Sequence, residues 1–216
     1  MISSSKLQQV PSVGTHIVDI SGANYDDIPE NFTRNSCKSC VYWEKGNASF
    51  SCPIAEKEVS KRNWFNTYSF IHGSCGKLVY HNGKVVAYAQ YAPGPTFQMS
   101  KMYHTYPSED AYLITCLLVA PGYRHQGFGR ILLKSIVDDL RARGVNAVET
   151  FARKDSEYNP SGPSRFYNQF GFVTKVDNAR LPLLRFELHE PQLQTRMSAL
   201  MMIASDSSKL PMMRTV

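Results

Sequence analysis

The sequence has no apolar run long enough to cross a membrane and no apolar leader. A membrane-spanning helix needs about 20 consecutive apolar residues, and no run in the chain reaches that length. The first ten residues are polar and lack the apolar stretch of a secretory signal. These two absences predict a cytoplasmic protein with no membrane partner.

Long blocks of one charge are also missing. The chain has 24 Lys and Arg against 18 Asp and Glu, for a formal net charge of +6. A basic surface attracts polyanions, but the basic residues are scattered and no known DNA- or RNA-binding motif is present. We therefore expect no nucleic-acid partner. The excess charge belongs either to solvated surface or to one local phosphate site.

Cysteine is scarce, and the five cysteines are odd in number. Without a secretory signal this count argues against a disulfide framework. One Cys-x-x-Cys pair has the spacing of a zinc knuckle, but a second such pair is missing. We therefore predict no metal site. The alternatives are that the cysteines are buried free thiols, or that Cys37 and Cys40 line a substrate pocket. The candidate zinc ligands are Cys37, Cys40, Cys52 and Cys75, with His72 and His81 as substitutes.

Hydrophobic periodicity predicts alternating strands and helices. Residues 1–36 are polar and predict an extended lead-in, and the proline-rich stretch 92–109 predicts a long loop. Asn82-Gly83 between two β-rich runs predicts a hairpin turn. Together the elements predict an α/β fold with a mixed central sheet flanked by helices. The predicted strands are 40–43, 77–81, 84–89, 113–119, 147–152, 172–176 and 183–188, and the predicted helices begin at 54, 129 and 161.

The most informative stretch is 119–130, Val-Ala-Pro-Gly-Tyr-Arg-His-Gln-Gly-Phe-Gly-Arg. It follows a predicted buried strand and leads into an amphipathic helix. Gly127 and Gly129 allow close approach of the backbone to a ligand, and the helix N-terminus offers unpaired N–H groups. Arg124 and Arg130 add positive charge. These features predict a pyrophosphate cradle, although neither a Walker loop nor a complete dinucleotide fingerprint is present.

Two sequence elements resemble motifs of the GNAT superfamily of N-acetyltransferases. Arg124-x-x-Gly127-x-Gly129, after Val119-x-Pro121, resembles its coenzyme A motif. Phe166-Tyr-Asn-Gln-Phe-Gly-Phe172 resembles its Tyr-x-x-x-Gly-Phe element.

The resemblance covers residues 77–188, and the Cys-x-x-Cys-x-x-Trp-Glu stretch at 37–44 is similar to a little-described bacterial branch. It implies a GNAT domain over 37–190, preceded by the N-terminal extension 1–36 and followed by a short helix and flexible tail over 191–216.

The resemblance also implies acetyl-CoA as co-substrate. It assigns the pantetheine arm to a strand and places the N–H of Leu118 on the thioester carbonyl. It assigns the pyrophosphate to the loop and first helical turn that follow. The implied cofactor-binding residues are Leu117, Leu118, Val119, Arg124, His125, Gln126, Gly127, Phe128, Gly129 and Arg130.

Two residues are candidates for catalysis. Tyr167 matches the family tyrosine that protonates the departing thiolate, and an aromatic core residue is the alternative. Glu149 lies in an apolar strand, where burial would raise the pKa of a carboxyl and suit it as a base. An ion pair or an outward-facing position is the alternative for Glu149. Glu109 and Glu44 are further candidates for the base.

The predicted activity is transfer of an acetyl group to a primary amine. The acceptor would be an amine-bearing small molecule or a protein amine, and a homodimer is compatible with the sequence. The alternative is a non-catalytic acyl-CoA-binding regulatory module, because the cradle uses mainly backbone groups.

Overall fold

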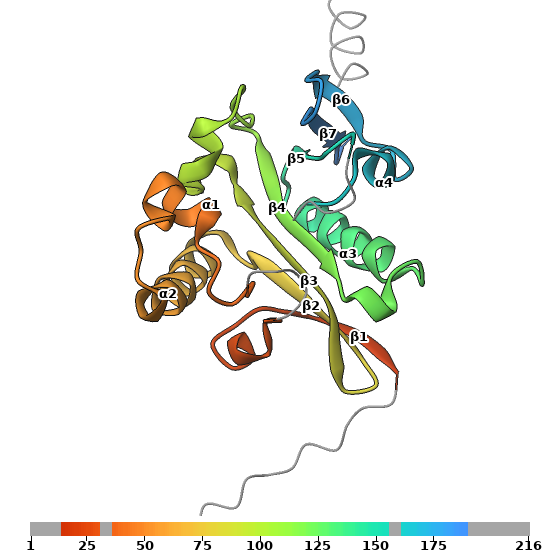
Figure 1. Cartoon of the computed structure of the whole chain (residues 1–216). Helices are drawn as coiled ribbons and strands as arrows, with labels where there is room; N and C mark the ends of the chain where they lie inside the picture. Colours follow the sequence, from red (N-terminus) through yellow and green to blue (C-terminus); the bar gives the residue numbers. More distant parts are fainter. Residues whose placement is uncertain (1–13, 31–35, 156–160, 190–216) are drawn as a thin grey trace, which may run out of the picture.

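A seven-stranded mixed sheet forms the centre of the molecule (Figure 1). The computed structural model describes residues 14–30, 36–155 and 161–189. Among the strands of the described sheet, β4 and β5 pair in parallel, and the other neighbouring strands are antiparallel. The predicted α/β fold with a mixed central sheet is therefore confirmed. In spatial order the strands are β1 (Thr15–Asp19), β2 (Gly76–His81), β3 (Lys84–Pro93), β4 (Ala111–Val119), β5 (Ala147–Phe151), β7 (Leu183–Glu187) and β6 (Val173–Val176).

Helices cover both faces of this sheet (Figure 1). One face carries α1 (Tyr42–Lys45) and α2 (Ile54–His72), and the other carries α3 (Phe128–Ala142) and α4 (Ser164–Asn168). Each face has its own cluster of buried apolar side chains. We call these the α2 face and the α3 face. Short 3₁₀ turns complete the fold: η1 (Tyr25–Asp27), η2 (Gly46–Ser49), η3 (Gly94–Thr96), η4 (Gln98–Met102) and η5 (Pro121–Tyr123).

Local sequence explains the best-predicted elements. The apolar stripe of α3 is buried against the sheet, as its 3.6-residue periodicity predicts. Gly144 ends this helix with φ +73°, a conformation that glycine adopts without strain. Asn82 and Gly83 both have positive φ, 50° and 75°, and form the predicted turn between β2 and β3. The residues of the stripe are Leu132, Leu133, Ile136, Val137 and Leu140.

Three predictions about the N-terminal half need correction. The predicted strand at 40–43 is wrong, because the Lys45 N–H donates to the Val41 carbonyl at 2.9 Å and closes a helical turn, α1. Short apolar runs do not distinguish strand from helix by periodicity. The predicted lead-in contains β1, which pairs with β2 at the sheet edge. The predicted loop 92–109 contains η3 and η4.

The predicted short helix and tail at 191–216 lie outside the described residues. In the described part of the chain, no helix combines the length and the apolar character that crossing a bilayer requires.

Candidate functional site

The central feature of the site is a gap between β4 and β5. The two strands pair only from Ala111 to Ile114 on β4, opposite Ala147 to Thr150 on β5. On its other side β4 stays paired with β3 as far as Val119. The stretch 115–119 therefore has one edge without a strand partner. An extended ligand can add to such an edge through main-chain hydrogen bonds.

Backbone alternation decides which residues face this gap. The Ala120 N–H donates to the Val86 carbonyl of β3 at 2.9 Å. Successive N–H groups of a strand point to opposite edges, so Leu118 also points toward β3. The gap receives the N–H groups of Leu117 and Val119 instead. The Leu118 N–H, which the resemblance assigns to the thioester carbonyl, therefore points toward β3 and not into the gap.

The loop after β4 ends in a helix N-terminus that presents free donors. His125 and Gly127 both have positive φ, 61° and 89°, which turns the loop sharply into α3. Gly127 is the N-cap of α3, and no side chain caps the helix. The first N–H groups of a helix have no intrahelical partner, and the dipole favours an anion there. The Gly127 Cα faces open space, so a ligand phosphate can approach it closely.

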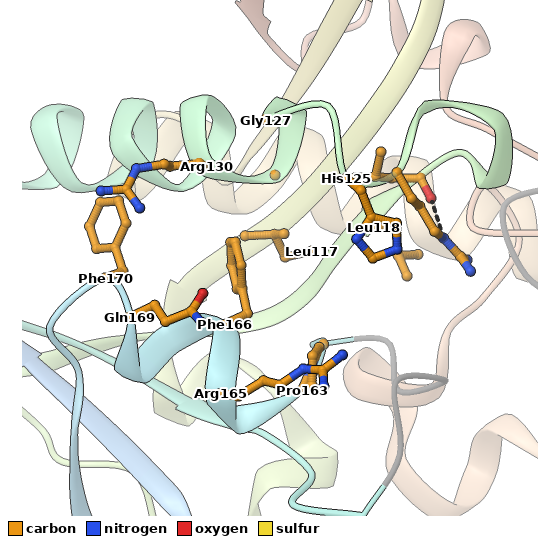
Figure 2. A pocket seen from close by; sticks show the side chains of 14 residues that line it. Leu117, Leu118, His125, Gly127, Arg130, Pro163, Arg165, Phe166, Gln169 and Phe170 are labelled. Carbon is orange, nitrogen blue, oxygen red and sulfur yellow. Dashed lines mark hydrogen bonds between the residues drawn. The ribbon is translucent and has the colours of Figure 1, made fainter.

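A cavity of about 360 Å³ joins the gap to this helix N-terminus. Figure 2 shows its walls, with the first turn of α3 on one side and α4 on the other. Three arginines and one histidine line it, and no carboxylate does. The positive lining and the free N–H groups fit a diphosphate-bearing ligand. The lining residues are Leu117, Leu118, Val119, Arg124, His125, Gly127, Gly129, Arg130, Gly162, Pro163, Arg165, Phe166, Gln169 and Phe170.

Eight of the ten cofactor residues predicted from the sequence line this cavity, and two do not. The Phe128 side chain is buried under His81 and Tyr123. The Gln126 amide donates to the Gly122 carbonyl at 3.0 Å, away from the lining.

The α4 side of the cavity was not predicted. Arg165 of this helix and Gln169, its C-cap, bring polar groups to the wall (Figure 2). The Tyr-x-x-x-Gly-Phe element predicts a role for α4, but it singles out only the tyrosine. Periodicity in five helical residues is too short to show which side faces a cavity.

Tyr167 lies on α4, buried behind the cavity wall. Its residue exposure is 0%, and its hydroxyl has no hydrogen-bond partner. Burial raises the pKa of Tyr167, and the neighbouring Thr150 hydroxyl, which donates to the Ile114 carbonyl at 3.0 Å, only partly offsets this. The phenol is therefore protonated at neutral pH and can act as a proton donor. Gly162 lines the cavity, and a Cβ atom added to it would lie 3.8 Å from Cε2 of the Tyr167 ring.

Glu149 is buried as predicted, but its pKa is not raised as a base would require. Its residue exposure is 0%, but both carboxylate oxygens are occupied. Ser108 donates through its N–H at 2.8 Å and also through its hydroxyl. Lys175 and Arg185 lie 2.9 and 3.1 Å away. Burial raises the pKa of Glu149, but these hydrogen bonds together lower it more. The ion-pair alternative is the observed one, and Glu149 ties the loop before β4 to β6 and β7. Glu109 is exposed.

The four candidate zinc thiols do not come together. Cys52 lies beside the Lys45 ammonium at 3.5 Å, whereas Cys75 is buried and contacts the Gly73 carbonyl. Among residues 14–30, 36–155 and 161–189, no three His, Cys, Asp or Glu side chains are arranged to hold a metal ion. The cysteines in this part of the chain are free thiols.

One family model matches the chain, whereas no curated protein does. A sequence model of the acetyltransferase (GNAT) family matches residues 37–172. None of the curated proteins compared with the chain matches it in sequence.

Several solved structures share the fold at low sequence identity. The PaiA N-acetyltransferase from Thermoplasma acidophilum in complex with coenzyme A has a TM-score of 0.53 at 12% identity, over 81% of this chain and 99% of that one. An N-acetyltransferase from Staphylococcus aureus Mu50 has a TM-score of 0.54 at 16% identity, over 81% and 99%. The putative acetyltransferase yncA from Salmonella typhimurium, with acetyl-CoA, has a TM-score of 0.54 at 13% identity, over 82% and 96%.

At these identities the structural neighbours establish the fold only. The matched segment 37–172 contains the gap, the cradle and α4, and it spans more than half of the 216 residues. The chain belongs to the acetyltransferase (GNAT) family.

Proposed function

We propose that this acetyltransferase moves an acetyl group from acetyl-CoA to a primary amine by direct attack. The observation that carries the proposal is the open edge of β4 at 115–119, which continues into the helix N-terminus of α3. One continuous strip of main chain can therefore hold an extended arm and a diphosphate together. The acceptor is an amine on a small molecule or on a protein.

Acetyl-CoA is the co-substrate of this family, and it supplies the acetyl group as an activated thioester. The Leu117 N–H can polarise the thioester carbonyl and stabilise the charge that develops there. The free N–H groups at Gly127 to Gly129, with Arg124 and Arg130, can hold the diphosphate.

Tyr167 supplies the proton for the departing thiolate. Its buried and unpartnered hydroxyl supports this role, because such a group is free to form a bond with sulfur once ligand is present. Its raised pKa keeps the proton in place until the thiolate forms.

The test combines calorimetry with thiol release. We expect saturable binding of acetyl-CoA, and release of coenzyme A thiol that depends on a primary amine. Binding without release on any amine would favour the alternative, a non-catalytic acyl-CoA-binding regulatory module. Absence of binding would refute both functions.

A further inference from the structure

A buried charged cluster lies on the α2 face of the sheet. Lys61 of α2 donates to Glu44 of α1 at 2.5 Å and to the side chain of Gln90 of β3 at 2.7 Å. The Gln90 amide donates in turn to Glu44 at 2.5 Å. The side-chain exposures of Lys61 and Glu44 are 2% and 4%, and Gln90 is fully buried. Such a cluster is costly to bury unless all its polar groups are paired.

One oxygen of this cluster is unpaired. The hydrogen bonds from Lys61 and Gln90 both end on Oε1 of Glu44, and Oε2 is buried without a partner. In the part of the chain that the structure describes, it is the only carboxylate oxygen in this condition. Glu149, the other buried carboxylate, uses both oxygens. A buried unpaired carboxylate oxygen needs a hydrogen-bond donor, and its setting indicates which kind.

The cluster lies beside the segment of β4 that faces the gap. Gln90 stands opposite Cys116 in the antiparallel pairing of β3 with β4. Cys116 directly precedes Leu117, the donor assigned to the thioester carbonyl. Neighbouring strands are about 4.8 Å apart, so Gln90 lies one strand away from that donor. Cys116 has a small side chain and belongs to the α2-face cluster of apolar residues.

Oε2 still needs a hydrogen-bond donor, because Lys61 and Gln90 both bond to Oε1. Burial lowers the pKa of Lys61, but the adjacent Glu44 carboxylate raises it more, so the ammonium stays charged. Lys61 therefore balances the charge of the whole Glu44 carboxylate but bonds only to Oε1, so Oε2 keeps lone pairs for a second donor. Aromatic residues adjoin the cluster in the sequence and the fold: Trp43, next to Glu44, stacks on Tyr103 at 5.2 Å between ring centroids. A primary ammonium on an apolar or aromatic body can donate to a carboxylate oxygen near such rings.

We propose that Glu44 Oε2 binds the ammonium group of the acceptor and removes its proton. This inference rests on the proposed function and assigns the base that the acetyl transfer requires. Lys61 and Gln90 are positioning residues that hold the carboxylate through Oε1.

The proton and bond changes balance. The ammonium R–NH₃⁺ gives one proton to Glu44 and becomes R–NH₂. Its nitrogen lone pair attacks the thioester carbon, a C–N bond forms and the C–S bond breaks. Tyr167 gives its proton to the sulfur, and the second proton lost by nitrogen restores the phenol. Glu44 then returns its proton to water, so the products are the amide, the free thiol and one proton.

The test uses the full chain, acetyl-CoA, and 2-phenylethylamine, hexylamine and a lysine-containing peptide as probes. The main variant is Glu44→Gln. Because this change leaves Lys61 buried without a counter-ion, two further variants protect the test against misfolding. Glu44→Asp keeps the charge but shortens the reach, and Glu44→Gln with Lys61→Met removes both charges. Glu149→Gln is the matched control, a second buried carboxylate changed to an amide.

We expect amine-dependent thiol release to fall at least about 100-fold in each folded Glu44 variant. The calorimetric affinity for acetyl-CoA and the slow thiol release without amine should stay within about twofold, since the cofactor cavity lies on the other face. Glu149→Gln should retain most of the amine-dependent rate.

Two results would overturn the inference while leaving the proposed function intact. One is recovery of amine-dependent turnover in the doubly neutral variant, which would make the cluster a structural ion pair with a buried water on Oε2. The other is an amine-dependent loss confined to Glu149→Gln, which would move the base to that residue. No thiol release by the wild-type protein on any amine would instead remove the proposed function itself.

Discussion

Replacing Tyr167 by phenylalanine removes a single hydroxyl, and it should separate stability from turnover. The hydroxyl is buried and unpartnered in the free protein. An unsatisfied buried polar group costs about 1–3 kcal/mol of stability. Removing the hydroxyl should recover this cost, and the small void that the change leaves should offset part of the recovery. We therefore expect Tyr167→Phe to range from no change to about 2 kcal/mol of added stability. In a chain of this size 1 kcal/mol shifts Tm by about 2–4 °C.

Tyr91→Phe is the matched control, since it removes the same atom from a bonded site. The Tyr91 hydroxyl lies 3.0 Å from the Asp139 carboxylate and 3.2 Å from the Ser74 hydroxyl. A hydrogen bond to a charged group contributes about 1.5–3 kcal/mol, so this variant should lose stability by that amount. Urea unfolding of both variants, with acetyl-CoA absent, measures the contrast.

Turnover should distinguish the two variants the other way round: the more stable variant, Tyr167→Phe, should lose turnover, and the less stable one, Tyr91→Phe, should not. A positioned general acid contributes about 10²–10⁴-fold, so Tyr167→Phe should lose that much in thiol release while its affinity for acetyl-CoA stays within about twofold. Tyr91→Phe should keep its turnover. Equal destabilisation by both variants would show that the Tyr167 hydroxyl is bonded in the free protein. Unchanged turnover in Tyr167→Phe would refute its role as the acid.

Three further predictions concern the cradle, the loss of stability at acid pH and the core. Gly127→Trp should abolish calorimetric binding of acetyl-CoA by filling the cradle, whereas Gly144→Trp, which shares the positive φ and the open surroundings, should bind normally; weak binding by both would point to strain in α3. The pKa of Glu149 is lowered on folding from 4.5, so its contribution to stability is present above about pH 4.5 and is lost as the pH falls through the lower folded pKa. Urea midpoints between pH 6 and pH 3 should therefore fall less steeply in Glu149→Gln, and an unchanged slope would argue against the ion pairs. Leu132→Ala should cost about 2–5 kcal/mol, and Ile131→Ala, at 39% exposure, should cost under about 1 kcal/mol by the same unfolding assay; similar losses would contradict the assigned core face of α3.

Much of the fold could be predicted because the signals are local. Asn82-Gly83 specifies its turn through two positive φ angles, and the stripe of α3 specifies a helix through its spacing. The cradle was also predictable, because it combines a glycine-rich loop with the start of that helix. Nothing distant is needed to form either element.

Features that depend on a partner strand or a neighbouring face could not be predicted. Leu118 and Leu117 are equivalent in an apolar run, and only the pairing of Ala120 with Val86 shows which N–H faces the gap. The segment 40–43 contains too few residues to show a period, and its packing made it a helix.

Glu149 shows the same limit in the site. An apolar strand predicted its burial, and burial is what the structure has. Burial alone raises the pKa of a carboxyl. The direction reversed because Lys175 and Arg185, more than twenty residues further along the chain, reach it across the sheet. Charges brought together by folding therefore decided its chemistry.

The sequence by itself determined the kinds of element, the glycine-rich cradle and the family, because each depends on residues close together in the chain. Tertiary structure alone decided which β4 amides face the gap, that α4 forms the second wall of the cavity, and that Glu44, rather than Glu149, keeps a free carboxylate oxygen. These depend on strand register and on side chains from distant segments. Periodicity carries no information about either one.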